Sequence, residues 1–512
     1  MDRDGKNISL WQDTQRFMPN SKPAPGAQYD VVIVGGGMTG VMTAVMLQTQ
    51  GKNCLLAESH NLGFGTTGGT TAHLNTLLDT PYHVIAKAFG EDSARTVATA
   101  ASEAIQLIEN NIRLLNIECE FARSDAFLFS QSESETNDLE RVFQSATKAG
   151  LSGEYVTDLP IPVAFEKAAR FQDQAKFNPL KYLFAIASEF ERLGGTIAHD
   201  CHVSDVHDDD GKISVTTSQG VFGTEKLVYA THIPPGINLL HLRCAPWRSY
   251  AMALKLAGER YPAGLIYDLK DPYHYYRSQT IDGQTYLIVG GKDHKTGENE
   301  NTEHVFATLH ADVERIFNIK EITHQWSSQY FESADGLPYI GHLPGSNSGI
   351  YVATGFGGNG MIYSHIAAQE ITRQILTGES IYENLFSPSR IKPIAGFNNF
   401  VTHNVDVVKH FVGKWISLHQ LGDLAEIAPG EGRVVKVENK PVALYKSENG
   451  KLHAVSSICT HMKCNVVWNG TERSWDCPCH GARYSPDGKV LTGPASQDLE
   501  VISLKDLFAS EA

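Results

Sequence analysis

The hydrophobic pattern near the N-terminus changes from a strand period to a helix period across a short glycine-rich stretch. Residues 29–34 form a β-branched apolar run, residues 35–40 read Gly-Gly-Gly-Met-Thr-Gly, and residues 41–50 are rich in Ala, Met and Leu. These three patterns favour a strand, a turn and a helix. A further apolar run at residues 53–57 predicts a second strand, which completes a βαβ unit with a right-handed crossover.

Further along the chain, strand and helix patterns alternate and then become antiparallel. We expect a helix over residues 179–193, closed by two glycines, and a strand over residues 196–198. Residues 261–289 are dense in Tyr, Ile and Val around an Asp-Gly turn, which predicts an antiparallel hairpin sheet. Residues 349–376 return to a strand, a glycine turn and a helix, so the first lobe is predicted to be discontinuous in sequence.

The last part of the chain has a different pattern. Pro, Gly and Asn are frequent over residues 386–400, and apolar residues follow at helical spacing up to Ile416. Short strand patterns with Asn-Gly and Asp-Gly turns fill the remainder. We therefore predict an N-terminal arm (1–28), an α/β Rossmann-like lobe with an antiparallel-sheet substrate lobe (29–385), a linker and connecting helix (386–416), and a small all-β domain (417–512).

Composition and charge narrow the classes of partner. The chain has 512 residues, of which 42% are hydrophobic, so it can bury a large core. Its 43 basic and 58 acidic residues give a net charge of -15, which opposes binding to nucleic acid and to anionic lipid. No run approaches the roughly 20 consecutive apolar residues of a membrane helix, and no secretory signal is visible, so we expect a cytoplasmic protein without a transmembrane segment.

Four of the eight cysteines gather near the C-terminus together with two histidines. They form a C-x-H arm, Cys459-Thr-His461, and a C-x-x-H arm, Cys477-Pro-Cys479-His480. Thiolate sulfur suits iron that is already bound to sulfide, whereas neutral imidazole leaves one iron electron-poorer and raises the potential of the cluster. The pattern predicts a mixed-ligand [2Fe-2S] centre. The alternative is a structural zinc site, because zinc also binds Cys and His at short spacings.

Together with Gly481, Tyr484 and Gly493-Pro-Ala495, these arms resemble the cluster-binding region of Rieske proteins. The resemblance implies that Cys459 and Cys477 hold one iron, that His461 and His480 hold the other, and that Cys464 and Cys479 form a disulfide. Ala482 stands where the quinol-oxidising branch often has a serine hydroxyl near a bridging sulfur, whereas Tyr484 remains as a donor to a ligand sulfur. Losing one such hydrogen bond should lower the potential of the cluster.

The glycine-rich turn at residues 35–40 has the spacing Gly-x-Gly-x-x-Gly between a strand and a helix. Backbone amides at the start of such a helix can hold a pyrophosphate, and Glu58 at the end of the next strand can accept the ribose hydroxyls. The candidate contacts in the turn are Gly35, Gly37, Met38, Thr39 and Gly40. This fingerprint predicts a dinucleotide site but does not distinguish NAD from FAD.

Other segments are similar to the FAD-dependent D-amino-acid oxidase/glycine oxidase superfamily. They are residues 65–72, 177–180, 227–231, 335–341 and 355–360. The resemblance covers about residues 29–385 and implies FAD as the cofactor. It places Thr66 and Thr67 along the flavin and phosphates, Val203 at the adenine, and Gly355, Gly357, Gly358 and Gly360 at the ribityl and ring end. It also implies that a helix starting near Met361 aims its N-terminus at the flavin.

The substrate side departs from the family pattern. In glycine-oxidase-like members an arginine that grips the substrate carboxylate follows a tryptophan by four positions, but here Trp326 is followed by Tyr330. A guanidinium beside aromatic rings can bind a carboxylate with two hydrogen bonds, so Arg277, next to Tyr276, is the substitute candidate. The candidates for catalysis are therefore Arg277, Tyr276 and Tyr330. We expect the histidines near the flavin segments to be structural.

The two implied cofactors differ in how many electrons they carry. A flavin takes two electrons together as a hydride, whereas a Rieske cluster passes one at a time. We therefore expect a FAD-dependent dehydrogenase that oxidises an amine or amino-acid-like substrate and passes electrons through the cluster to a ferredoxin, cytochrome or quinone. The alternatives are an NAD(P)H-linked flavin and iron-sulfur reductase, and a non-catalytic redox carrier.

Overall fold

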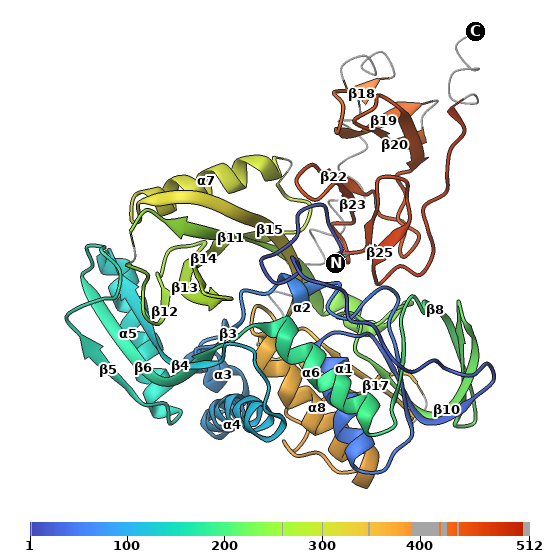
Figure 1. Cartoon of the computed structure of the whole chain (residues 1–512), viewed down its shortest axis with the longest axis horizontal. Helices are drawn as coiled ribbons and strands as arrows, with labels where there is room; N and C mark the ends of the chain where they lie inside the picture. The colour runs from blue at the N-terminus through green and yellow to red at the C-terminus, as the bar shows by residue number, and fades with distance from the viewer. Residues whose placement is uncertain are drawn as a thin grey trace.

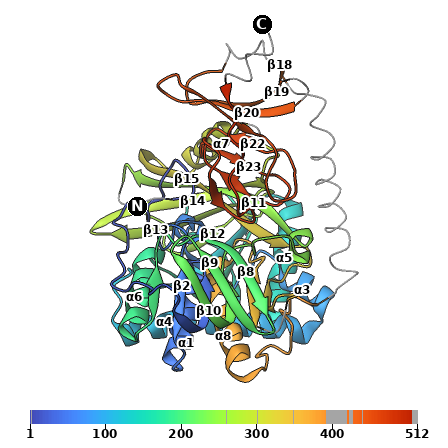
Figure 2. The ribbon, with the colours of Figure 1, turned by 90° about the vertical axis from the view of Figure 1, so that its right-hand side faces the viewer.

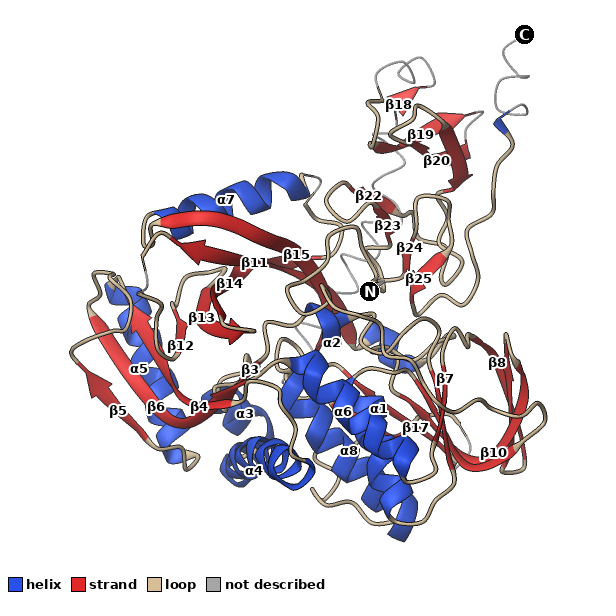
Figure 3. Ribbon diagram, viewed as in Figure 1, coloured by secondary structure: helices blue, strands red, loops and turns tan. Residues whose placement is uncertain are grey.

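The computed structural model consists of two lobes and a smaller C-terminal domain (Figures 1 and 3). It describes residues 1, 3–258, 260–299, 301–346, 349–390, 419–420, 427–437 and 440–504. The predicted connecting helix and most of the predicted linker lie outside these residues. Within them, no helix has both the length and the apolar character required to span a membrane.

The first lobe contains a sheet with the strand order β16-β17-β10-β1-β2-β7. Its strands are β1 (Gln28–Val34), β2 (Cys54–Ala57), β7 (Thr196–Ala198), β10 (Gly220–Tyr229), β16 (Tyr339–His342) and β17 (Ile350–Thr354). All of these strands run parallel except β16, and a hairpin of β8 (Val203–Asp209) and β9 (Lys212–Thr217) extends from β10. The predicted βαβ unit is confirmed, because β1 pairs in parallel with β2 and their register joins Val31 to Cys54.

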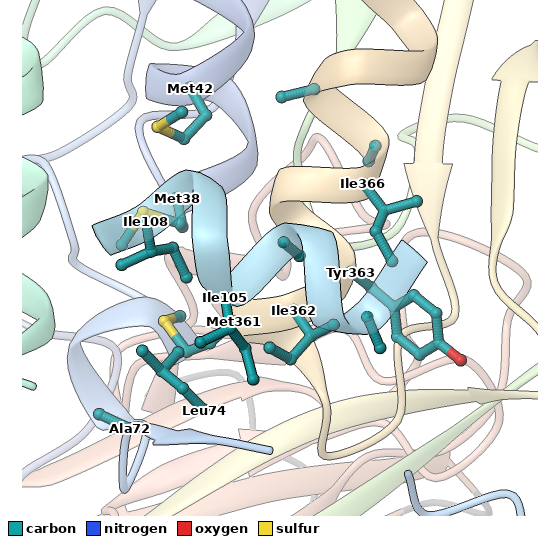
Figure 4. Close-up of a cluster of buried hydrophobic side chains, with 14 of the residues drawn as sticks. Met38, Met42, Ala72, Leu74, Ile105, Ile108, Met361, Ile362, Tyr363 and Ile366 are labelled. Atoms are coloured by element: carbon teal, nitrogen blue, oxygen red, sulfur yellow. The ribbon is translucent and has the colours of Figure 1, made fainter. Parts of the chain in front are cut away.

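The helices of this lobe are α1 (Met38–Thr49), α3 (Tyr82–Phe89), α4 (Glu91–Leu115), α6 (Pro179–Arg192) and α8 (Gly360–Thr377). Local signals set their ends: the Asn178 side chain accepts the Lys181 N–H at the start of α6, and Gly378 closes α8 in a left-handed conformation. Figure 4 shows Met38 of α1, Ile105 of α4 and Met361 of α8 in one buried cluster. The N-terminal ends of α1 and α8 therefore share one apolar support.

The second lobe is a mostly antiparallel sheet with the strand order β15-β11-β14-β13-β12-β4-β6-β3. Its strands are β3 (His73–Leu74), β4 (Ala122–Ser130), β6 (Lys167–Lys176), β11 (Cys244–Leu256), β12 (Leu265–Tyr267), β13 (His274–Ile281), β14 (Gln284–Lys295) and β15 (Ile319–Ser333), with β5 (Gly153–Val156) beside β6. The remaining helices are α2 (Thr66–Gly69), α5 (Glu133–Lys148), α7 (Thr302–Glu314) and the 3-10 turn η1 (Leu239–Leu242). The predicted hairpin is confirmed, since β13 and β14 pair across the Asp282-Gly283 turn.

The C-terminal domain is all β, as predicted. One sheet contains β18 (His419–Gln420), β19 (Gly432–Val437), β20 (Lys440–Lys446) and β21 (Leu452–Ser456), and the other contains β22 (Val467–Asn469), β23 (Ser474–Asp476), β24 (Arg483–Tyr484) and β25 (Val490–Thr492). The predicted Asn-Gly and Asp-Gly turns separate β20 from β21, β22 from β23, and β24 from β25. Figure 2 shows this domain above the sheet that contains β11 and β15.

The N-terminal arm is more deeply embedded than its sequence suggests. Ser9, Trp11 and Gln12 are buried, and the Trp11 indole donates a hydrogen bond to the Thr70 carbonyl oxygen at 2.6 Å. Gln12 Nε2 donates to the carbonyl oxygens of Gly63 and Phe64. The arm therefore braces the loop that leads into α2. Its polar residues bind distant backbone groups, which is a relation that local composition does not reveal.

Candidate cofactor and substrate site

The glycine turn between β1 and α1 is shaped by very close backbone approaches. A side chain at Gly40 would place its Cβ 1.9 Å from the Gly35 carbonyl oxygen, and Gly35 has a φ of 110°. Both positions therefore require glycine. The backbone N–H of Gly36 donates to Glu58 Oε2 at 2.7 Å, so the acidic residue at the end of β2 is held against the turn. Burial raises the pKa of Glu58, although the hydrogen bond from Gly36 opposes this shift.

The turn opens into a cavity of about 650 Å3. The predicted FAD contacts that line it are Gly35, Gly37, Met38, Thr39, Glu58, Thr66, Thr67, Val203, Gly357, Gly358 and Gly360. Gly40 and Gly355 are not among the lining residues: Gly40 packs on the turn itself, and Gly355 packs beside Ser333. Val203 is the first residue of β8.

The cavity fits a dinucleotide. The N-terminus of α1 faces it, where backbone N–H groups lack partners within the helix. Met38 N–H donates to Thr67 Oγ1 at 3.1 Å, which ties α2 to this helix start. The N-terminal end of α8 reaches the same cavity through Asn359, Gly360 and Met361.

One region of the cavity is lined by acids and tyrosines from several elements. We call the set Asp79, Asp293, Glu332, Tyr273, Tyr275 and Tyr330 the acid–tyrosine cage. Tyr330 Oη donates to Asp293 Oδ2 at 2.9 Å, and the Gly358 N–H donates to Asp79 Oδ2 at 2.6 Å. The second hydrogen bond joins the cage to the Gly357–Gly360 loop, so the cage adjoins the predicted flavin end of the cavity.

Burial and mutual repulsion make these acids hard to ionise. Burial raises the pKa of Asp293 to about 6, and the charge of Asp79 adds to the shift. Burial likewise raises the pKa of Glu332 to about 7, with further contributions from Asp79 and Asp293. Among the described residues that line the cavity, Lys270 is the only lysine or arginine.

The structure separates the three sequence candidates for catalysis. Tyr330 lines the cavity, but Arg277 and Tyr276 do not. The Arg277 guanidinium is fully buried and donates to the carbonyl oxygens of Thr71 and Phe177, at 2.9 and 3.4 Å. Its side chain is thus engaged in bracing the chain, and Tyr276 packs against Phe317 in a separate core. We do not retain either residue as a substrate contact.

The three histidines near the predicted flavin segments do not all line the cavity. His73 and His232 line the cavity, whereas His342 does not. His73 Nδ1 lies 2.7 Å from Tyr267 Oη, and burial lowers the pKa of His73 well below its ordinary value. Burial also lowers the pKa of His232 to about 4. Both imidazoles are therefore neutral at pH 7.

Sequence analysis missed the three acids of the cage. Asp79 precedes α3, Asp293 lies on β14 and Glu332 lies on β15, so no local motif joins them. A partial signal was the aromatic run at residues 273–276, in which Tyr273 and Tyr275 alternate onto one face.

The loops that follow β21 and β23 bring the Cys and His arms together. Cys459 and Cys477 are buried free thiols. A hydrogen bond from Cys477 lowers the pKa of Cys459 to about 6, and Tyr484 Oη lies 3.2 Å from its sulfur. The rings of His461 and His480 lie 5.0 Å apart between centroids. His461 Nδ1 is buried without a hydrogen-bond partner, as a nitrogen that binds a metal would be.

The other two cysteines of this region are bonded to each other. Cys464 and Cys479 form a disulfide with an S–S distance of 2.08 Å. The sulfur atoms of Cys464, Cys477 and Cys479 lie within 4.8 Å of one another, but the disulfide leaves only Cys477 free to bind a metal. The donors that remain are two thiols and two imidazoles, which fit a [2Fe-2S] cluster with mixed ligands.

The C-terminal domain touches the segment between β10 and β11 through the histidine side of these loops. His461 Nε2 lies 3.0 Å from the Gly236 carbonyl oxygen, and the His241 ring lies 4.5 Å from the His461 ring. His461 and His480 are only 8% and 2% exposed. Residues 490–493 and 495–496 of the C-terminal domain line the same cavity as the glycine turn.

A buried network of six charges joins the N-terminal arm, strand β11 of the second lobe and the C-terminal domain. Asp476 pairs with Arg248 of β11 at 2.9 Å and with Arg483 at 3.1 Å. Arg483 also pairs with Asp4 at 2.7 Å, and the arm residue Arg3 pairs with Asp4 and Glu472. Burial opposes the ionisation of Asp476, but Arg483 and Arg248 outweigh it and lower its pKa to about 2. Three cations and three anions balance the network.

Comparison with known proteins identifies two domains in the chain. A family model described as FAD dependent oxidoreductase matches residues 30–374, and a Rieske [2Fe-2S] domain model matches residues 415–503. The Bacillus subtilis (strain 168) protein YhfW, whose name describes a Rieske 2Fe-2S iron-sulfur protein, is 32% identical over 477 residues, or 93% of each chain. Iron-sulfur subunit 1 of the Synechocystis cytochrome b6-f complex is 35% identical over 100 residues, which are 19% of this chain and 55% of that protein.

Solved structures resemble the two-lobed part of the chain. Glycine oxidase from Geobacillus kaustophilus has a TM-score of 0.58 and 20% identity, covering 71% of this chain and 99% of that one. L-amino acid deaminase from Proteus vulgaris has a TM-score of 0.59 and 16% identity, covering 73% and 100%. These likenesses show a shared fold.

Proposed function

Because the chain belongs to the FAD-dependent oxidoreductase family and ends in a Rieske [2Fe-2S] domain, we propose that it is a dehydrogenase for an amine or amino-acid-like substrate. Its cofactors are FAD and a [2Fe-2S] cluster. In this proposal, electrons taken from the substrate leave one at a time through the cluster to an external acceptor, such as a ferredoxin, a cytochrome or a quinone.

One observation carries the proposal: the predicted cluster ligands lie against the segment between β10 and β11, which also lines the cavity that would hold the flavin. His461 contacts Gly236, and the cavity that begins at the glycine turn reaches residues 490–496 of the C-terminal domain. Electron transfer weakens steeply with distance, so this contact supports direct transfer within the chain. The buried charge network would hold the two parts in this position.

The residues would have distinct roles in the cofactor sites. Gly35, Gly37 and the N–H groups of α1 would hold the pyrophosphate, and Glu58 would accept the ribose hydroxyls. The N-terminus of α8 would place partial positive charge near the flavin. Cys459 and Cys477 would bind one iron, and His461 and His480 the other. When bound, FAD supplies a two-electron hydride acceptor and the cluster a one-electron carrier.

The test is anaerobic mixing of the purified protein, loaded with both cofactors, with a panel of amines and amino acids. Flavin bleaching followed by the EPR signal of a reduced cluster is the expected result. Bleaching by NAD(P)H alone would support the reductase alternative, and bleaching by neither class would support a non-catalytic carrier. Colourless protein that contains stoichiometric zinc would contradict the cluster assignment.

A further inference from the structure

Resting on the proposed function, we propose that the substrate is an amine that carries a second, protonated amino group and needs no carboxylate. The acid–tyrosine cage would bind that second ammonium group while the reacting amine lies toward the flavin. A short aliphatic diamine has this chemistry, whereas an α-amino acid with a neutral side chain has no second amino group.

The cage has unsatisfied acceptor capacity inside the cavity. Asp293 accepts the Tyr330 hydroxyl at Oδ2, but its Oδ1 is buried and has no hydrogen-bond partner. An ammonium group has three N–H donors and no acceptor, so it matches a carboxylate with a free oxygen. The faces of tyrosine rings also attract cations.

The charge of the cavity selects for a cation. Asp79, Asp293 and Glu332 repel one another, as the raised pKa values of the last two indicate. A bound ammonium group would relieve this repulsion, whereas a carboxylate would add to it. The position where family members carry a carboxylate-binding arginine is Tyr330, whose hydroxyl is directed at an acid instead. Arg277, the other candidate for a carboxylate contact, is engaged with backbone carbonyls and does not itself line the cavity.

The reaction balances without a further reagent besides water and the external acceptor. A C–H bond beside the neutral nitrogen breaks, its hydrogen and both electrons leave as hydride to FAD, and the nitrogen lone pair forms a C=N bond. Water adds to the resulting iminium ion, which gives an aldehyde and an ammonium ion. The two electrons then pass singly to the external one-electron acceptor. The second ammonium group of the substrate stays unchanged throughout.

The experiment compares 1,4-diaminobutane, butylamine and γ-aminobutyrate, each of which has four carbon atoms. Each compound is tested as an anaerobic reductant of the flavin in the fully loaded protein. We expect diaminobutane to half-saturate at a concentration at least about 10-fold below that of butylamine, and γ-aminobutyrate to bind most weakly. Preferential reduction by γ-aminobutyrate, or equal saturation by butylamine and diaminobutane, would overturn the inference and leave the proposed function standing. Reduction by no amine or amino acid would overturn both.

Two variants locate the binding group. Asp293→Asn should raise the half-saturating concentration of diaminobutane by about 10- to 100-fold and change that of butylamine by less than about 3-fold. Asp138→Asn is the matched control and should change neither, because Asp138 is a half-buried residue of α5 that does not line the cavity. Diaminobutane should also raise the melting temperature of the wild-type protein but not of Asp293→Asn. An equal loss of affinity for both amines in Asp293→Asn would contradict a role in holding the second ammonium group.

Discussion

At the scale of single residues, the ionisation of the cage costs folding stability. The folded pKa values of Asp293 and Glu332, about 6 and 7, lie above their ordinary values of 3.8 and 4.5. The folded chain therefore binds more protons than the unfolded chain in the window between these values, and the free energy of unfolding falls as the pH rises through it. The charged and titratable groups that face the two acids are Asp79, Tyr273, His274, Tyr275, Lys295 and Tyr330, and the Ser249 hydroxyl faces Asp293. We expect Asp293→Asn to raise the free energy of unfolding at pH 8 by on the order of 1 kcal/mol in denaturant titrations. A variant less stable than wild type at pH 8 would contradict this account.

A second prediction at this scale concerns Tyr484. Its hydroxyl lies 3.2 Å from Cys459 Sγ, and a hydrogen bond to a ligand sulfur stabilises the more negative, reduced cluster. Tyr484→Phe should therefore lower the reduction potential, as measured by a redox titration followed by EPR. The buried ring is retained, so the cluster content should stay near that of the wild type. An unchanged potential in a fully loaded variant would show that this hydroxyl does not act on the sulfur.

At the scale of elements, the N-terminal arm acts as a brace for the loop before α2. Trp11 is 2% exposed, donates to Thr70 and lies under the Arg277 guanidinium, 5.5 Å from the ring centroid. Trp11→Ala should lower the free energy of unfolding by about 3–5 kcal/mol and speed the release of FAD, because Thr66 and Thr67 lie in the braced segment. Chemical denaturation and flavin fluorescence measure the two effects. Tyr155 of β5, an aromatic residue that is 42% exposed, provides the control. Tyr155→Ala should change the free energy of unfolding and the release of FAD only slightly.

The helices and strands also show which parts of the structure could be predicted from the sequence and which could not. The βαβ unit, the β13–β14 hairpin and the all-β C-terminal domain follow from local periodicity and turn chemistry, because each is formed by neighbours in the chain. Cys459 and His461 could be singled out for the same reason. The cage and the arm could not, because Asp79, Asp293 and Glu332 meet only through the tertiary fold, and Trp11 binds a carbonyl 59 residues away. Arg277 shows the converse: its aromatic neighbourhood suggested a ligand contact, but its donors bind backbone oxygens.

At the scale of the whole molecule, we expect the position of the C-terminal domain to depend on Arg248 of the charge network. Removing this cation would leave Asp476 with one buried partner fewer, which typically costs about 3–5 kcal/mol. Arg248→Met should slow reduction of the cluster by the flavin while the substrate still bleaches the flavin at the wild-type rate. Rapid-mixing spectroscopy separates the two steps, and Arg123→Met, an exposed arginine of β4, is the matched control. Equal slowing of both steps would indicate general damage instead of a docking defect.

The contact between His461 and Gly236 also limits which surface of the C-terminal domain is accessible to another protein. The Gly236 carbonyl oxygen contacts the His461 ring, and His241 packs beside the rings of both His461 and His480. The surface formed by His461 and His480 is therefore covered within the chain. We therefore expect the proposed external electron acceptor to approach the C-terminal domain from another side. An acceptor that docks there would take electrons on a face of the C-terminal domain other than the one that contacts Gly236 and His241.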